Sequence, residues 1–474
     1  MHGSTPAPTP PRARRLARVA LAGGAAAALG LGAAAPAGAQ SADPGSVVPS
    51  VVPGSLLGVP SLSVAAVAAL GAPVPLGTVL GSLAAAGSGE FPRPGSSSTP
   101  TTPVAVRDTG ITSSRVLRVQ PLFPGSSNAY DRRAEVWTVT SESMQRTVRV
   151  EVYRAPEGLT APNVYFLDGV GSEAPSGWSK GMGWGDPAVR DRAVNVVVPT
   201  GAPSSMWSDW VRDDPVLGPN QWETFLTREL PPLLAAGLPG TAPGLAHNGS
   251  WGAMGVSMGA ASALHLVNAN PDMFDAAGGV SGAYSALDEL GYQYARLTVA
   301  ANHGDVTNMW DERGSAAWRR HDTIADPSGL TGKHVFLSAA TGAVGSSDLG
   351  RFGSNEMVLL DGHILEKGSY ESTRALEAAL AGVPGVALKT AYVPSGIHNW
   401  PVFVPQMLPA LDHVLGGLAP ATGTRVPVAD GPGASGSLGS AGSSDPVGST
   451  GSSGSSGSSG SPGSTVPGSA GSGS

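Results

Sequence analysis

The residues around Ser257 are those best suited to covalent chemistry in this chain. Residues 255–259 read Gly-Val-Ser-Met-Gly, a G-x-S-x-G pattern, between an apolar stretch that predicts a strand (253–256) and an alanine-rich stretch that predicts a helix (258–268). Small neighbours allow the sharp strand-to-helix turn that lifts a serine hydroxyl above a sheet. The pattern predicts Ser257 as a nucleophile, with the backbone N–H of Met258 at the helix N-terminus facing a developing oxyanion.

A nucleophilic serine of this kind needs a histidine base, which in an α/β-hydrolase lies in a loop after the last strand. His398 has that position, between a predicted strand (388–393) and a predicted C-terminal helix (405–415). His265 and His413 fall inside predicted helices, where packing or a surface role is the expected function. The spacing therefore favours His398.

The third member of such a triad is a carboxylate that fixes the tautomer of the histidine and stabilises its charged form. It must lie near the C-terminal edge of the sheet rather than on a solvated helix face. Glu366 precedes a predicted helix (370–381), whereas Glu371 and Glu377 look like ordinary residues of that helix. We predict Glu366, and the other acidic residues between the preceding strand and His398 stay open as alternatives: Asp348, Glu356, Asp361, Glu371 and Glu377.

The elements that must position these residues predict the α/β class. Apolar strand-like runs alternate with helical patterns, as in a mainly parallel central sheet with helices on both faces. The predicted strands are 148–153, 164–167, 193–198, 253–256, 276–280, 334–338 and 388–393. The predicted helices are 222–236, 258–268, 370–381 and 405–415. We therefore expect an α/β-hydrolase fold in a single globular domain, residues 106–419.

The N-terminal flank has the composition of an export signal. Four arginines between positions 12 and 18 precede an apolar stretch (19–35), and Ala-Gly-Ala at 37–39 suits a signal peptidase. We predict a signal peptide over 1–39, cleaved after Ala39, and hence a secreted or cell-envelope protein. A retained membrane anchor is the alternative.

Two further segments are not expected to pack. Residues 40–105 are rich in Pro, Gly, Ser and Ala and lack sustained periodicity, which predicts a flexible leader. Residues 420–474 are dominated by Gly and Ser, which predicts a disordered tail.

Composition excludes several functions. The formal net charge of −7, with no Lys/Arg run outside the predicted signal, argues against nucleic acid as a partner. With no cysteine, the chain has neither a disulfide nor a thiol nucleophile. No H-E-x-x-H pattern, cluster of metal ligands or phosphate loop is present, so we expect no metal and no organic cofactor.

The similarity to one known group extends over the whole central region. The blocks that carry it are Ser-Met-Gln-Arg (143–146), Tyr-Phe-Leu-Asp-Gly (165–169), residues 204–210, residues 222–231, the segment 255–259, Asn-Met-Trp (308–310), Ser-Asp-Leu-Gly (347–350) and His-Asn-Trp (398–400). Together they resemble the mycolyltransferases of the antigen 85 type and their corynebacterial relatives, the trehalose mycolyltransferases, within the esterase-like α/β-hydrolases. Several blocks in family order are far more specific than G-x-S-x-G alone.

This resemblance implies roles for particular residues. Ser257 would take a long-chain acyl group from a trehalose ester, with His398 as base, a glutamate as third member, and the backbone N–H groups of Met258 and Val170 as oxyanion hole. Gly171 stands where the mycobacterial proteins carry a sugar-binding arginine, so that contact is expected to differ. Candidate substrate-binding residues are Asp168, Gly171, Ser208, Asp209, Trp210, Trp310, Asn399 and Trp400. Core or rim packing is the alternative for the three tryptophans.

The expected function is an exported serine acyltransferase. It would move a mycolyl-type acyl group from a trehalose ester to a carbohydrate hydroxyl, on a trehalose monoester or a cell-wall polysaccharide. Its partners would be trehalose glycolipids and cell-envelope carbohydrate, with association with the outer lipid layer as a further expectation. Two alternatives remain: a secreted carboxylesterase with the same triad, and a non-catalytic wall-binding or adhesion protein that keeps the fold.

Overall fold

The computed structural model describes residues 107–126, 130–181, 187–353 and 356–426. The predicted signal peptide (1–39), the predicted leader (40–105) and residues 427–474 of the predicted tail lie outside the described residues.

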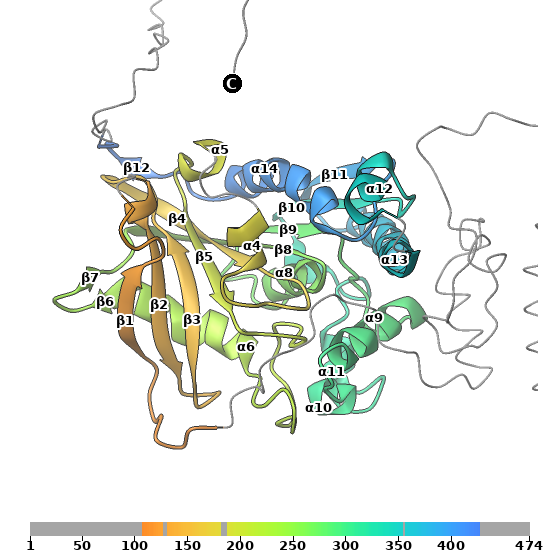
Figure 1. The fold of residues 1–474 in the computed structure, drawn as a ribbon, viewed down its shortest axis with the longest axis horizontal. Helices are drawn as coiled ribbons and strands as arrows, with labels where there is room; N and C mark the ends of the chain where they lie inside the picture. Colours follow the sequence, from red (N-terminus) through yellow and green to blue (C-terminus); the bar gives the residue numbers. More distant parts are fainter. Residues whose placement is uncertain (1–106, 127–129, 182–186, 354–355, 427–474) are drawn as a thin grey trace, which may run out of the picture. The chain divides into compact units, whose positions relative to one another are not determined.

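A ten-stranded sheet organises the part of the chain that the structure describes (Figure 1). Its strands run in the order β1-β2-β3-β5-β4-β8-β9-β10-β11, with β12 paired to β4. The strands are β1 Arg115–Pro121, β2 Ala134–Ser141, β3 Arg146–Tyr153, β4 Leu159–Leu167, β5 Asn195–Thr200, β8 His247–Val256, β9 Ala276–Val280, β10 His334–Ala340, β11 Ala387–Val393 and β12 Thr422–Gly423. A separate two-stranded sheet consists of β6 Gly237–Leu238 and β7 Ala242–Pro243.

The sheet is parallel from β5 through β4, β8, β9 and β10 to β11, and antiparallel among β1, β2, β3 and β5. In a parallel sheet the carboxyl ends of neighbouring strands lie at the same edge, which is where such folds bind ligands. The ends of β4, β8, β9 and β10 are therefore the expected positions for active-site residues.

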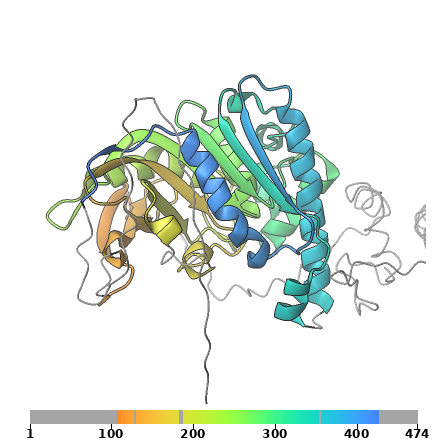
Figure 2. The ribbon, with the colours of Figure 1, turned by 90° about the horizontal axis from the view of Figure 1, so that it is seen from above.

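Helices cover both faces of this sheet, as the sequence predicts (Figure 2). The helices are α4 Gly177–Gly181, α5 Pro187–Arg190, α6 Trp222–Thr224, α7 Leu230–Ala236, α8 Met258–Ala269, α9 Glu289–Ala300, α10 Val306–Trp310, α11 Ala316–Arg320, α12 Ser346–Phe352, α13 Glu356–Leu380 and α14 Trp400–Gly416. A π-helical turn, Phe225–Glu229, joins α6 to α7, and 3₁₀ turns occur at Asp131–Arg133 and Ser328–Leu330.

Alternation along the strands explains why the sheet carries two hydrophobic cores. Ala253 and Leu337 belong to the core with α7, α8 and α13, whereas their chain neighbours Met254 and Phe336 belong to the core with α14. Successive strand side chains point to opposite faces, so an uninterrupted apolar run fills both cores at once. The apolar runs of the sequence thus predict a sheet buried on both sides.

One long helix begins earlier than the sequence predicts. The expected helix covers 370–381, whereas α13 starts at Glu356, so that Glu366 lies inside a helix and not in an upstream loop. Glycines in the first half of α13 weaken its sequence signal, because glycine has low helix propensity. They allow close packing: a Cβ at Gly362 would lie 2.8 Å from Cδ1 of Ile397.

The C-terminal boundary of the domain is also different. The sequence predicts a disordered tail from residue 420, but β12 pairs antiparallel with β4, placing Thr422 opposite Thr160. The backbone N–H of Val426 donates to the carbonyl oxygen of Glu157 over 2.8 Å. The predicted boundary at 419 is therefore too early, because backbone pairing holds a segment whose composition is that of a linker.

No helix among the described residues combines the length and the apolar content needed to cross a bilayer.

Candidate active site

Ser257 occupies a strained turn between β8 and α8. Its backbone dihedral angles are φ 55° and ψ −121°, a region that residues other than glycine rarely adopt. Ideal Cβ atoms would lie 2.3 Å from the carbonyl of Gly259 if built on Gly255, and 2.2 Å from the carbonyl oxygen of Leu167 if built on Gly259. Neither position has room for a side chain, so both must be glycine. Their absence of a Cβ lets the start of α8 pack closely against the end of β4.

Replacing Gly259 with alanine is expected to destabilise the fold by several kcal/mol, on the order of 3 or more, because the new methyl group would meet backbone atoms that cannot rotate away. Denaturant unfolding measures this loss. Gly350→Ala is the matched control, since a Cβ at Gly350 in α12 meets nothing within 4 Å and alanine favours a helix. Equal stability of the two variants would contradict the packing described for the turn.

Ser257, His398 and Glu366 form a continuous chain of hydrogen bonds. The Ser257 Oγ lies 2.8 Å from Nε2 of His398, and Nδ1 of His398 lies 2.7 Å from Oε2 of Glu366. The carboxylate accepts a hydrogen bond from the N–H at Nδ1, so the proton stays on Nδ1 and Nε2 is free to accept the proton of the serine hydroxyl. This is the geometry of a serine nucleophile with its base and orienting acid.

The Glu366 carboxylate is fully buried and fixed by three donors. Its Oε1 accepts from the Ser281 hydroxyl over 2.7 Å and from the backbone N–H of Ala340 over 2.6 Å, while Oε2 faces His398. Ala340 ends β10 and Ser281 follows β9, so the carboxylate lies at the carboxyl edge of the sheet although its helix starts far upstream. Ser281 is a positioning residue that the sequence does not reveal.

The loop that carries His398 docks on the same helix as Glu366. The backbone N–H of His398 donates to the carbonyl oxygen of Gly362 over 2.9 Å, and the preceding residue, Ile397, is fully buried against Gly362. The Asn399 side chain then caps α14 by accepting from the backbone N–H of Trp400. Base and acid are therefore held by one helix, which fixes their separation.

The segment after β4 lies against the nucleophile. A Cβ built on Gly169 would lie 3.3 Å from Cβ of Ser257, so the backbone passes close to the serine. The carbonyl of the next residue, Val170, accepts from the backbone N–H of Ser204 over 2.9 Å, which fixes this peptide segment. Val170 and Met258 both line the pocket beside Ser257, as required of two residues whose N–H groups would hold an oxyanion.

A pocket of about 110 Å³ opens beside Ser257 and His398. It runs between α8 and α9 and is mostly apolar, as suits an acyl chain. Its lining includes residues of α8, α9 and α10 and the residue directly after α11: Met258, Ala261, Ser262, His265, Gly291, Tyr294, Ala295, Leu297, Thr298, Trp310 and His321. Helix α9 is absent from the sequence-based prediction, although Asp288 caps its N-terminus by accepting from the N–H of Gly291.

Among the predicted substrate contacts, Trp310 alone lines this pocket, while the polar groups of several others are engaged inside the protein. The Ser208 hydroxyl accepts from the indole N–H of Trp310, and Trp210 donates to the carbonyl of Ser205. The Asp209 carboxylate accepts from the backbone and hydroxyl of Thr224. Packing explains these positions, and substrate contact stays a prediction for them.

Trp400, Asn399 and Gly171 also lie outside the lining of the pocket. Trp400 packs edge-on against Trp178, next to Gly177. Gly171 is half-buried in the turn after β4. Their predicted contacts with substrate likewise stay predictions.

Asp168 is buried at the end of β4, directly before the Gly169–Val170 segment. Its carboxyl group accepts from the Ser176 hydroxyl over 2.6 Å and from the backbone N–H of Gly177 over 3.2 Å. Burial raises the pKa of Asp168 to about 7, the two hydrogen bonds oppose this, and the nearby charge of Glu151 adds to it. The carboxyl group is therefore protonated over most of the acidic range.

This raised pKa gives the stability a defined pH dependence. The folded protein binds the Asp168 proton more tightly than the unfolded chain, in which aspartate has a pKa of about 3.9. Proton binding by Asp168 therefore contributes on the order of 4 kcal/mol to the free energy of unfolding. This contribution is complete below about pH 4 and is lost as the pH rises towards 7. Asp168→Asn should remove this pH-dependent contribution. The stability of the variant relative to the unmodified protein should therefore rise between pH 4 and 7 in denaturant unfolding. Parallel pH profiles of the two proteins would show the assignment to be wrong.

A serine in a strained turn after a parallel strand, hydrogen-bonded to a histidine that is itself hydrogen-bonded to a buried acid, defines a serine α/β-hydrolase site. The Esterase family matches residues 141–414, more than half of the chain. The chain is 30% identical over 302 residues to the diacylglycerol acyltransferase/mycolyltransferase Ag85A of Mycobacterium ulcerans, covering 61% of this chain and 83% of that protein. It is 31% identical over 294 residues to the Ag85B protein of Mycolicibacterium smegmatis, covering 60% and 85%.

The chain therefore belongs to the antigen 85 type of mycolyltransferase within the Esterase family. It is an enzyme of the acyltransferase kind, which sets aside the non-catalytic alternative. Among solved structures, MPT51 (FbpC1) of Mycobacterium tuberculosis matches with a TM-score of 0.49 and 24% identity, covering 60% of this chain and 99% of that one.

Proposed function

We propose that this protein is an exported acyltransferase that moves a long-chain, mycolyl-type acyl group from a trehalose ester to a carbohydrate hydroxyl. The hydrogen-bonded chain Ser257–His398–Glu366, at the edge of an apolar pocket, is the observation that carries the proposal. The names of its relatives, diacylglycerol acyltransferase/mycolyltransferase, support acyl transfer and the mycolyl-type acyl group.

The first half of the cycle acylates the serine. Nε2 of His398 takes the hydroxyl proton while Oγ of Ser257 attacks the ester carbonyl carbon. The charge that develops on the carbonyl oxygen faces the N–H groups of Met258, at the N-terminus of α8, and of Val170. When the tetrahedral intermediate collapses, His398 returns the proton to the leaving sugar oxygen, and the acyl group remains on Ser257.

The second half transfers the acyl group to an acceptor hydroxyl. His398 removes the proton of that hydroxyl, its oxygen attacks the acyl-serine, and the proton returns to Ser257. Glu366 does not take up a proton in either half; its carboxylate stabilises the imidazolium and keeps Nδ1 protonated. Transfer and hydrolysis therefore differ only in whether a sugar hydroxyl or water arrives second.

The site of action belongs to the same proposal. The predicted signal over 1–39 supports a protein that is secreted or kept at the cell envelope, where trehalose glycolipids, wall carbohydrate and the outer lipid layer would be its partners. N-terminal sequencing of the protein recovered from the medium or the envelope tests this, with Gln40 expected as the first residue.

Product analysis tests the reaction. The full-length chain is incubated with a trehalose monoester of a long-chain acid, and the products are identified by mass spectrometry. Trehalose diester as the main product supports acyl transfer, whereas free acid as the only product, unchanged by added trehalose, would show a carboxylesterase.

A further inference from the structure

The apolar pocket beside Ser257 ends at a group of polar side chains. Ala261 and His265 follow the nucleophile along one face of α8, and both line the pocket. His265 lies eight residues beyond Ser257, which is about 12 Å along an α-helix. The rings of His265 and His321 stack with 4.2 Å between centroids, and His321 stacks in turn on Trp310 at 4.1 Å. An acyl chain that fills the pocket therefore ends against histidine.

The hydrogen bond of His321 fixes which of its ring nitrogens is free. Nδ1 lies 2.7 Å from the carbonyl oxygen of Ala317, and because a carbonyl can only accept, Nδ1 carries the proton. Burial, and next the nearby His265, lower the pKa of His321 well below its ordinary value, so the ring is neutral. Its Nε2 is therefore an acceptor, and this buried atom has no hydrogen-bond partner among the residues that the structure describes.

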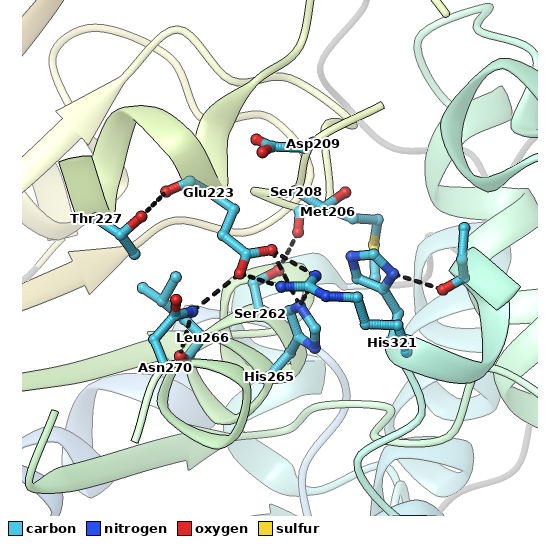
Figure 3. A network of polar contacts seen from close by, with 12 residues as sticks. Met206, Ser208, Asp209, Glu223, Thr227, Ser262, His265, Leu266, Asn270 and His321 are labelled. Carbon is cyan, nitrogen blue, oxygen red and sulfur yellow. Dashed lines mark hydrogen bonds and ion pairs between the residues drawn. The ribbon is translucent and has the colours of Figure 1, made fainter. Parts of the chain in front are cut away.

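The neighbouring charges do not make this group a metal site. Glu223, His265 and His321 lie close enough together to suggest one. However, the guanidinium group of Arg320 donates to both Glu223 oxygens, over 2.6 and 2.7 Å, and lies 3.3 Å from Nε2 of His265. Figure 3 shows the Glu223 carboxylate beside the ring of His265. A cation is thus already paired with the only carboxylate of the group. The Nδ1 of His265 is also buried without a partner among the described residues, so the end of the pocket offers ring nitrogens to a neutral polar ligand.

We propose that this pocket selects acyl chains that carry a hydroxyl group about ten bonds from the ester carbonyl, with Nε2 of His321 accepting the hydrogen bond. An extended polypeptide advances about 3.3–3.6 Å per residue of three backbone bonds, which is about 1.2 Å per bond. At the same advance per bond, an extended acyl chain of about ten bonds spans about 12 Å. A methyl end would leave a buried acceptor without a donor, whereas a hydroxyl end would satisfy it. The proposal rests on the proposed function only in taking the pocket as the acyl site.

Binding to a Ser257→Ala variant tests the subsite without any turnover. Titration calorimetry on the full-length chain would compare straight-chain acids of eight, ten and twelve carbons with their terminal hydroxy counterparts. We expect the hydroxyl to tighten binding by about tenfold near ten carbons and to have a smaller effect at the other lengths. Equal or weaker binding of the hydroxy acid at every length would overturn the proposal, and would show that water or nothing occupies the polar end.

A second substitution assigns the preference to His321. Ser257→Ala/His321→Phe keeps a flat ring for stacking on Trp310 but removes the acceptor, so the two acids should bind about equally. The matched control is Ser257→Ala/His413→Phe, because His413 also bonds a backbone carbonyl, that of Ala387, but does not line the pocket. The control should retain the preference; its retention in the His321 variant would contradict the proposal.

Failure of the subsite and failure of the proposed function are distinguishable. Acylation of Ser257 in the unmodified protein by an unsubstituted ester, seen by mass spectrometry, reports on the function alone. The titrations report on the subsite alone, because they need no reaction.

Discussion

Replacing Ser257 with alanine is expected to lower the rate of acyl transfer by a factor of about 10⁴ or more while leaving the protein folded. Alanine keeps the turn but removes the only hydroxyl group within hydrogen-bond distance of Nε2 of His398 among the described residues. Without it, catalysis is limited to what substrate binding and the oxyanion donors contribute. Initial rates with a chromogenic long-chain ester, measured beside a thermal unfolding curve, give both quantities.

The matched control for this variant is Ser328→Ala. Ser328 is an exposed serine in a 3₁₀ turn away from the lining of the pocket, so its loss should leave the rate within about twofold. A fluorophosphonate should label the unmodified protein and this control but not the Ser257 variant. Labelling of another serine with activity retained would reject Ser257 as the nucleophile.

Glu366→Gln is expected to lower kcat by about 10³- to 10⁴-fold. The amide can present its N–H groups to Nδ1 of His398, which favours the tautomer with the proton on Nε2 and blocks transfer from the serine. The amide also loses the negative charge that stabilises the imidazolium. Steady-state kinetics with the chromogenic ester measure the effect.

Glu377→Gln separates Glu366 from Glu377, one of the five acids that the sequence leaves open as alternatives to it. The Glu377 carboxylate accepts from the hydroxyl groups of Tyr392, over 2.8 Å, and Thr390, over 3.2 Å, both in β11. The substitution should therefore change kcat by less than about twofold. A large loss at Glu377 with little at Glu366 would reverse the assignment of the acid.

The sequence predicts the site residues that closely follow a parallel strand, because such residues lie at the carboxyl edge of the sheet. Ser257 and His398 follow from motif and order alone, because β8 and β11 end at the same edge. Glu366 follows from the requirement for a carboxylate near that edge, although the loop expected around it is a helix. The strand ends that receive it, at Ser281 and Ala340, carry no pattern by which serine or alanine could be recognised as its partners.

Other features depend on tertiary packing that local patterns do not encode. The glycines of α13 are unfavourable in an isolated helix, yet they are the points where Ile397 and Tyr294 pack against it. α14 begins at Trp400 and not at the predicted 405. Pro405 and Pro409 lie inside it, and because proline usually begins or interrupts a helix, the sequence pattern places the start too late. The polar end of the pocket consists of His265 from α8 and His321 directly after α11. The two residues are far apart in the sequence, so no local pattern predicts their contact.

The most direct test of the central claim is to isolate the acyl-enzyme and offer it an acceptor. The full-length protein would be mixed briefly with a trehalose monoester, separated from it, and analysed by intact mass and peptide mapping. The account predicts the mass of the acyl group on the peptide containing Ser257, and its discharge by added trehalose with formation of trehalose monoester. An acyl group on another residue, or discharge to free acid at a rate that trehalose does not change, would contradict it.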